Sequence, residues 1–140
     1  MVVKQQFLSS FVNIAFNHIH TIAVIDDDPA VRDSFRLLLQ DYGFHVREFS
    51  SAAAFLGAPQ KFCCLLIDLA MPETDGLQLL ELLRLGDVQT PGILMVDKEE
   101  PKLASRIRAA NAYARLVKPI AEGKLLRAIA GACEAGHNAN

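Results

Sequence analysis

Acidic side chains follow two apolar runs of this chain, at the points where those runs end. Asp68 ends the run at 63–67. Asp26 and Asp27 follow the run at 21–25. Runs of this length and composition are typical of buried parallel strands. The carboxyl ends of such strands form the site in open α/β sheets, so we expect the three carboxylates to lie together. Clustered carboxylates repel one another, and a hard divalent cation such as Mg²⁺ relieves the repulsion through oxygen ligands.

The residues around these acids indicate turns and the start of a helix. The pairs Met-Pro and Asp-Gly follow Asp68 and favour turns, which would hold a short loop around this carboxylate. Asp28 before Pro29 is the pattern of a helix N-cap with proline at the first helical position. That role explains Asp28 but not the preceding Asp26 and Asp27.

A lysine follows the last apolar run of the chain. Residues 112–117 are expected to form a strand, and Lys118-Pro119 comes directly after it. A lysine at that edge of the sheet would face the acidic pocket. We expect the Lys118-Pro119 peptide bond to be cis, which would turn the side chain inward. Taken alone, a Lys-Pro pair is also common in ordinary loops.

These motifs, in this order, resemble those of response-regulator receiver domains, the phosphoryl-accepting modules of two-component signalling. Asp26 and Asp27 match the acidic pair of that family, and Asp68 matches its phosphorylated aspartate. Lys118-Pro119 matches its lysine–proline pair. The resemblance extends over most of the chain, from about residue 21 to about residue 133, and within it residues 43–52 are similar to the receivers of nitrogen-fixation and LuxR-type regulators.

Strand-like and helix-like segments alternate five times along the chain. Apolar runs predict strands near 21–25, 45–49, 63–68, 92–96 and 112–117, and helical periodicity predicts helices near 29–42, 51–56, 76–85, 101–110 and 121–134. This alternation predicts an α/β protein with a parallel sheet and helices on both faces. The flavodoxin-like, doubly wound form of this five-stranded sheet has the order 2-1-3-4-5, which places the ends of its first and third strands together.

Length and composition are those of one domain of 140 residues. We place the receiver domain at 21–135, between an N-terminal extension at 1–20, either helical or partly disordered, and a tail at 136–140. A net charge of −2 gives no indication of nucleic-acid or anionic-membrane binding. No apolar stretch reaches the roughly 18 residues that span a bilayer. Three cysteines without C-x-x-C spacing favour a reducing, cytoplasmic compartment.

The resemblance implies a signalling chemistry. A phosphohistidine donor, either a histidine kinase or a histidine phosphotransfer protein, would transfer a phosphoryl group to Asp68 in a phosphorelay. Asp26, Asp27, Asp68 and the backbone carbonyl of Ala70 would hold Mg²⁺, and Lys118 would neutralise phosphoryl charge. The domain would not be an enzyme, although slow hydrolysis of its aspartyl phosphate would make the mark temporary. We expect a stand-alone receiver, a monomer or weak homodimer, that acts by binding an unidentified downstream protein.

Two switch positions depart from the family pattern. Receivers usually carry Thr or Ser at the end of the fourth strand, where this chain has Val96, and an aromatic residue three before the lysine, where it has Arg115. Valine keeps the size and loses the hydroxyl, which removes a charge-assisted hydrogen bond worth roughly 1.5–3 kcal/mol. Asp97 then adds a negative charge close to the expected phosphoryl group.

These departures leave two further hypotheses open. One is a pseudo-receiver, a protein-interaction module that works without phosphorylation, but the presence of Asp26, Asp27, Asp68 and Lys118 together argues against it. The other is a Mg²⁺-dependent phosphatase with Asp68 as nucleophile. Such enzymes usually carry a second acid two residues later, where this chain has Ala70.

Overall fold

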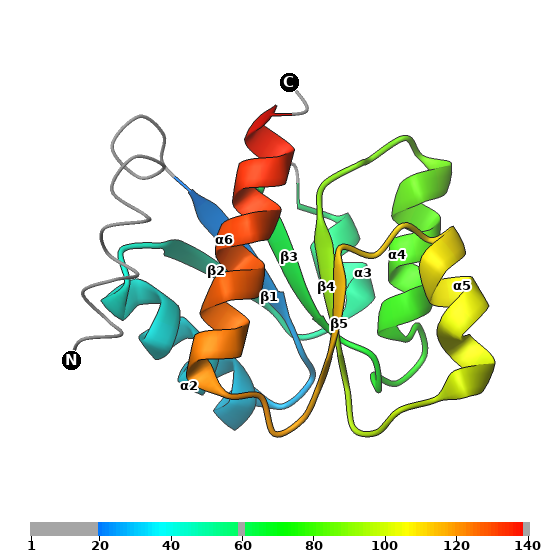
Figure 1. Cartoon of the computed structure of the whole chain (residues 1–140), viewed down its shortest axis with the longest axis horizontal. Coiled ribbons are helices and arrows are strands. Elements are labelled where there is room, and N and C mark those ends of the chain that lie inside the picture. The colour runs from blue at the N-terminus through cyan, green and yellow to red at the C-terminus, as the bar shows by residue number, and fades with distance from the viewer. Residues whose placement is uncertain (1–19, 59–60, 139–140) are drawn as a thin grey trace.

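The computed structural model describes residues 20–58 and 61–138. Five parallel strands form one sheet with the order β2-β1-β3-β4-β5, which confirms the predicted flavodoxin-like topology (Figure 1). The strands are β1 (Thr21–Ile25), β2 (His45–Phe49), β3 (Cys64–Asp68), β4 (Gly92–Val96) and β5 (Ala114–Val117).

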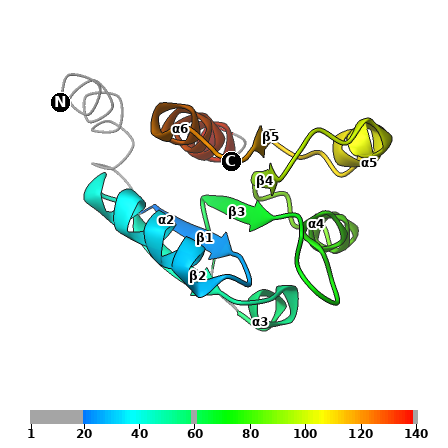
Figure 2. The same ribbon diagram turned by 90° about the horizontal axis from the view of Figure 1, so that it is seen from below.

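Helices cover both faces of this sheet. They are α2 (Pro29–Asp41), α3 (Ala52–Leu56), α4 (Gly76–Leu85), the 3₁₀ turn η1 (Pro101–Leu103), α5 (Ala104–Ala109) and α6 (Glu122–Asn138). In the view of Figure 2, α2 and α6 lie on one side of the strands, and α3, α4 and α5 lie on the other. Both faces of the central strands are therefore shielded from water.

Most boundaries agree with the predicted ones to within one residue, and larger differences occur at the last strand and the last two predicted helices. The third strand begins at Cys64, and the last begins at Ala114 rather than 112. The helix predicted at 101–110 is divided into η1 and the shorter α5. The last helix extends to Asn138, beyond the expected end of the domain at 135. Of the extension predicted at 1–20, residues 1–19 lie outside the described part of the chain.

Hydrophobic side chains on the two faces of the sheet form two clusters. One lies against α2 and α6 and includes Val24 and Leu66. The other lies against α3, α4 and α5 and includes Ala23 and Leu65. Successive residues of one strand therefore enter different clusters, as the pleat of a β-strand requires. This two-sided burial explains why β1 and β3 are continuous apolar runs in the sequence.

Capping interactions fix the starts of the two helices that follow the acidic strand ends. The Asp28 carboxylate accepts hydrogen bonds from the backbone N–H groups of Ala30 and Val31, which confirms its predicted N-cap role at α2. Asp75 and Gln78 form a capping box at α4. Both helix starts are therefore determined by local sequence.

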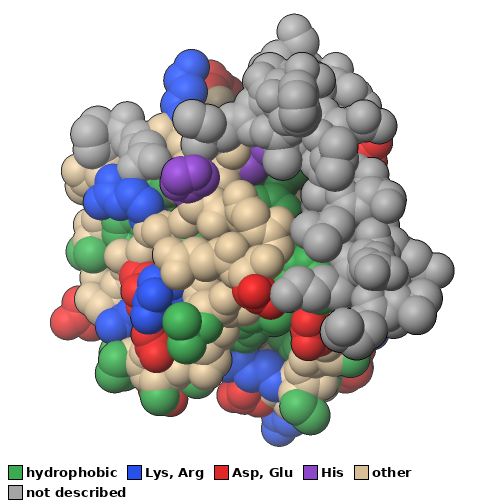
Figure 3. Space-filling model, turned by 90° about the vertical axis from the view of Figure 1, so that its left-hand side faces the viewer, with side chains coloured by type: hydrophobic (Ala, Val, Ile, Leu, Met, Phe, Trp, Pro, Cys, Tyr) green, Lys and Arg blue, Asp and Glu red, His purple; other side chains and the backbone are tan. Residues whose placement is uncertain are grey.

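Charged side chains of both signs are interspersed on the face of the molecule that Figure 3 shows, with only small groups of hydrophobic side chains between them. This mixture agrees with the small net charge of the chain. Among residues 20–58 and 61–138, no helix has the length and hydropathy that crossing a bilayer requires.

Candidate functional site

Three carboxylates meet where β1 and β3 end. Each of Asp26, Asp27 and Asp68 offers an oxygen within 4.8 Å of the oxygens of the other two. Asp26 and Asp68 are buried, with 1% and 5% of their surface exposed, and Asp27 is exposed. The register that pairs Ile25 with Ile67 brings these strand ends to the same level. The pocket is therefore a product of parallel pairing and lies open to solvent on the Asp27 side.

Lys118 brings a positive charge into this pocket from the end of β5. Its Nζ donates a hydrogen bond of 2.8 Å to Oδ1 of Asp68. The Lys118-Pro119 peptide bond is cis, as the sequence predicted. A second acid, Asp97, has Oδ1 at 3.9 Å from the same ammonium group. The lysine thus lies between the buried carboxylate and the loop that follows β4.

Burial and neighbouring charges shift the pKa values of this site. Burial raises the pKa of Asp26, and the charges of Asp68 and Asp27 add to the increase, against a hydrogen bond from the Asp28 backbone and the charge of Lys118. Burial lowers the pKa of Lys118, but its hydrogen bond to Asp68 and the charges of Asp68, Asp26 and Asp97 outweigh that effect and raise it overall. The carboxylates of Asp26, Asp68 and Asp97 therefore stabilise the charged form of Lys118.

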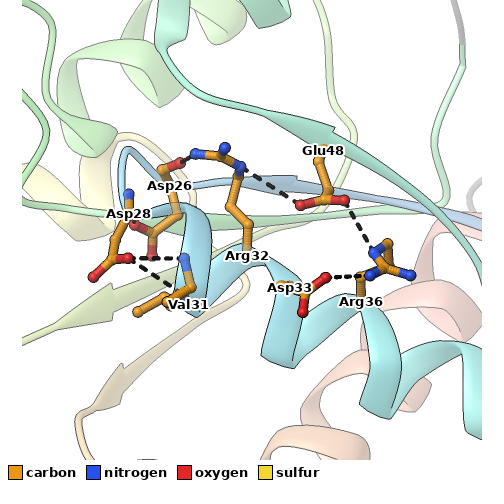
Figure 4. A network of polar contacts seen from close by, with 8 residues as sticks. Asp26, Asp28, Val31, Arg32, Asp33, Arg36 and Glu48 are labelled. Carbon is orange, nitrogen blue, oxygen red and sulfur yellow. Dashed lines mark hydrogen bonds and ion pairs between the residues drawn. The ribbon is translucent and has the colours of Figure 1, made fainter.

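Asp26 is held by two hydrogen bonds, one to its carboxylate and one to its backbone carbonyl (Figure 4). Its Oδ1 accepts a 2.9 Å hydrogen bond from the Asp28 N–H. Its backbone carbonyl accepts a 2.6 Å hydrogen bond from Nη1 of Arg32 on α2. Asp26 is consequently fixed relative to both the strand end and the helix start.

The positioning role of Arg32 has no counterpart in the sequence interpretation. Its Nε lies 3.6 Å from Oε1 of Glu48 on β2, and Arg36 lies 3.1 Å from the other oxygen of Glu48. Arg36 also pairs with Asp33 within α2. In Figure 4 these side chains form a chain of contacts from β2 across α2 to Asp26. The role of Arg32 could not be predicted from the sequence, because it depends on the packing of α2 beside β2.

The carboxylates fit a divalent cation. Oδ2 of Asp26 is buried and has no hydrogen-bond partner within the described residues, so its lone pairs are available to a ligand. Burying an ionised oxygen without a partner is unfavourable, and a bound cation would compensate it. The oxygen donor set and its charge match the preference of Mg²⁺. Ala70 is exposed two residues after Asp68, and the role of its carbonyl as a ligand stays a prediction.

The two atypical switch positions lie on the neighbouring strands β4 and β5. Val96 ends β4 and is 2% exposed, so a buried apolar side chain occupies the expected hydroxyl position. Arg115 on β5 forms an ion pair of 2.7 Å with Glu99 in the loop after β4. Nε of Arg115 is buried without an acceptor within the described part of the chain. Two ion pairs therefore connect this loop to β5 and the residue after it: Glu99 with Arg115, and Asp97 with Lys118.

Tyr113, the aromatic residue closest in sequence to Arg115, lies away from this loop. A side-chain carbon at Gly131 of α6 would collide with the Tyr113 hydroxyl, so Tyr113 packs on α6. It is 42% exposed. Tyr113 precedes β5 and packs on α6, whereas Arg115 on β5 contacts the loop through Glu99.

A doubly wound sheet with an acid cluster and a lysine at its carboxyl edge defines a class of phosphoryl-signalling domains. The family model for the response regulator receiver domain matches residues 22–130, and the chain belongs to this family.

Two curated relatives give the same result. The transcriptional regulatory protein FixJ of Bradyrhizobium diazoefficiens is 36% identical over 113 residues, covering 79% of this chain and 55% of FixJ. The response regulator protein TmoT of Ectopseudomonas mendocina is 38% identical over 111 residues, covering 77% of this chain and 50% of TmoT. This chain therefore spans about half the length of the curated relatives that it matches.

Solved structures agree with the fold. The crystal structure of FixJ-N has a TM-score of 0.77 at 31% identity and covers 84% of this chain and 95% of that one. A CheY-like receiver domain protein from Methanospirillum hungatei has a TM-score of 0.82 at 23% identity, covering 88% of this chain and 100% of its own. The second likeness concerns the fold alone. Together these matches make the chain a two-component signalling domain.

Proposed function

We propose that this receiver accepts a phosphoryl group on the carboxylate of Asp68 from a phosphohistidine donor, either a histidine kinase or a histidine phosphotransfer protein. The main support is the contact between Lys118 Nζ and Asp68 Oδ1 at 2.8 Å. It joins the acid that ends β3 to a cation from a distant strand, in a pocket with two more carboxylates. A structural ion pair alone would not account for those additional acids.

The chain's own groups have distinct parts in this reaction. Asp68 attacks the phosphorus in line, and the leaving imidazole keeps the electron pair of the broken P–N bond. Asp26, Asp27 and Asp68 would hold Mg²⁺, which when bound neutralises the charge of the phosphoryl oxygens. Lys118 moves its hydrogen bond from the free carboxylate to a phosphoryl oxygen and stabilises charge there. Arg32 keeps Asp26 in place through the backbone carbonyl.

The output would be a change in protein–protein contacts, transmitted by the loop after β4. Val96 offers no hydroxyl to the phosphoryl group, so coupling would depend on charge. Asp97 shares Lys118 with Asp68, and a phosphoryl group would compete for this lysine and repel Asp97. The ion pair of Glu99 with Arg115 would then be the contact that resists movement of the loop.

A pseudo-receiver that binds its partner without phosphorylation is the second candidate. The observation in its favour is the buried Val96 side chain at the switch position. Under this alternative, occupation of the acid pocket would not change the surface formed by β5 and the loop after β4.

Phosphoryl acceptance can be measured directly. The chain would be incubated with Mg²⁺ and acetyl phosphate, and intact-mass spectrometry would follow addition of one phosphoryl group. We expect labelling of the native protein and of Asp87→Asn, which removes an exposed acid after α4 and outside the pocket, and none of Asp68→Asn. An unlabelled native protein whose thermal midpoint is also unmoved by Mg²⁺ with BeF₃⁻ would favour the pseudo-receiver. Labelling of Asp68→Asn would move the acceptor to another acid.

A further inference from the structure

Three side chains that can react with oxidants or metals meet near the starts of the strands, at the edge of the sheet away from the acid pocket. His20 precedes β1, Cys63 precedes β3, and Cys133 lies on α6. Each offers a nitrogen or sulfur atom within 4.8 Å of those of the other two. The two sulfur atoms are in direct contact at 2.7 Å. The last turns of α6 lie beside this edge of the sheet in Figure 1.

The backbone holds these residues in place. Cys63 N–H donates to the carbonyl of Thr21 at 3.0 Å, and the carbonyl of His20 accepts from His45 N–H at 3.0 Å. Both residues are therefore tied into the ends of the sheet. On α6, a side-chain carbon at Gly136 would lie only 3.6 Å from the Cys63 carbonyl, which shows how closely the helix approaches. The sulfur contact is consequently set by rigid elements on both sides.

The two thiols differ in environment. Cys63 is half-buried and Cys133 is 1% exposed within the core under α6. The contact with Cys63 and burial both raise the pKa of the Cys133 thiol, which stays protonated. Cys63 is therefore the sulfur that an oxidant would reach first, and Cys133 is placed to react second.

We propose that Cys63 and Cys133 are a reversible oxidation site. Peroxides would oxidise the two thiols to an intramolecular disulfide. The Cys63 thiolate, its proton passed to solvent or to the nearby imidazole of His20, attacks one peroxide oxygen. The O–O bond breaks, leaving a sulfenic acid at Cys63 and one molecule of water or alcohol. The Cys133 sulfur then attacks the Cys63 sulfur, the S–O bond breaks, and the departing hydroxide takes the Cys133 proton as water. Two thiols are oxidised and one peroxide is reduced, and a dithiol reductant reverses the change.

A soft metal ion is the competing occupant of the same cluster. Two thiolates bound to one tetrahedral zinc ion are about 3.8 Å apart, which is wider than the sulfur contact seen here. The described residues supply three ligands where structural zinc sites have four. Both observations favour the disulfide.

The test uses the whole chain and hydrogen peroxide. Thiol titration should fall from three free cysteines to one, the intact mass should fall by two hydrogen atoms, and peptide mapping should find residue 63 linked to 133. Cys133→Ser should lose the link. Cys64→Ala is the matched control, since Cys64 is adjacent in sequence and buried, and it should form the link at the native rate. Oxidation should raise the thermal midpoint by on the order of 10 °C, because the link closes a long loop between β3 and α6.

Three results would overturn the proposal. Oxidation of Cys63 to sulfinic acid with Cys133 still free would show that the second step does not occur. A link involving Cys64, or between two chains, would show that the sulfur contact does not direct the reaction. Stoichiometric Zn²⁺ binding at submicromolar affinity, lost in Cys63→Ser and His20→Gln, would make the cluster a metal site instead. None of these measurements depends on Asp68, so they are independent of the proposed phosphoryl transfer.

Discussion

The Lys118 ammonium donates a 2.8 Å hydrogen bond to the Asp68 carboxylate although the two residues lie 50 positions apart in the sequence. Lys118 follows β5, at one edge of the sheet, and Asp68 ends the central strand β3. The bond therefore extends past the end of β4. In this position the lysine stabilises the free carboxylate, and under the proposed function it would also stabilise a phosphoryl oxygen on Asp68.

Replacement of Lys118 tests this contact. Lys118→Met keeps much of the aliphatic stem and removes the charge, so we expect the affinity for BeF₃⁻ in the presence of Mg²⁺ to fall about 10- to 150-fold, which corresponds to roughly 1.5–3 kcal/mol. Lys124→Met removes an exposed lysine of α6 and should leave the affinity unchanged. Calorimetric titration would measure both. Equal affinities in the native protein and Lys118→Met would remove the lysine from the mechanism.

The raised pKa of Asp26 gives a pH dependence with a defined sign. The folded state binds this proton more tightly than the unfolded chain does, because burial disfavours the charged form. The stability that the protonated carboxyl contributes is complete below the ordinary value of 3.8 and is lost as the pH rises through the raised value. Without Mg²⁺, Asp26→Asn should therefore unfold at a higher urea concentration than the native protein at neutral pH, and this advantage should disappear in acid.

Mg²⁺ should reverse this order. A concentration ten times the dissociation constant adds about 1.4 kcal/mol to the free energy of unfolding of the native protein. Asp26→Asn lacks the charged ligand and should gain much less, whereas the exposed control Asp87→Asn should gain the native amount. The same Mg²⁺ increment in Asp26→Asn and the native protein would argue against a cation at this pocket.

The loop after β4 should respond weakly to a phosphoryl analogue in the native protein. Val96 cannot donate a hydrogen bond to it, so we expect small BeF₃⁻-dependent changes in hydrogen exchange over residues 96–117. Val96→Thr restores a hydroxyl with nearly the same volume and should enlarge the change, while Val96→Ala should not. A large protection change in the native protein that Val96→Thr leaves unaltered would point to another route, with the Glu99–Arg115 ion pair as the first contact to remove.

Gly76 allows α4 to begin directly against the end of β3. A side-chain carbon at this position would collide with the carbonyl oxygen of Asp68 and lie 2.9 Å from Cγ2 of Ile67. We expect Gly76→Ala to lower the free energy of unfolding by about 1–3 kcal/mol, the usual cost of overpacking. Gly57→Ala is the control, since its nearest neighbours are 3.7 Å away and it should be neutral or stabilising by up to about 1 kcal/mol. Urea denaturation of both variants measures the difference.

Local patterns in the sequence determined the order and type of the elements and the parallel topology. Continuous apolar runs identify strands buried on both faces, and the acid at the end of such a run lies at the carboxyl edge by necessity. The N-cap at Asp28 follows the same logic, because capping depends on neighbours within one turn. The location of Asp26, Asp68 and Lys118 in one pocket could be predicted for this reason, whereas their roles in phosphoryl transfer stay predictions.

Only the tertiary structure decided the contacts between elements that are distant in sequence. The support of Asp26 by Arg32, the ion pair of Arg115 with Glu99 and the sulfur contact of Cys63 with Cys133 each join separate elements. Their formation depends on how helices pack on the sheet and which rotamers this packing allows, and no periodicity along the chain encodes it. The division of residues 101–110 into η1 and α5 likewise depends on packing beyond the local helical pattern.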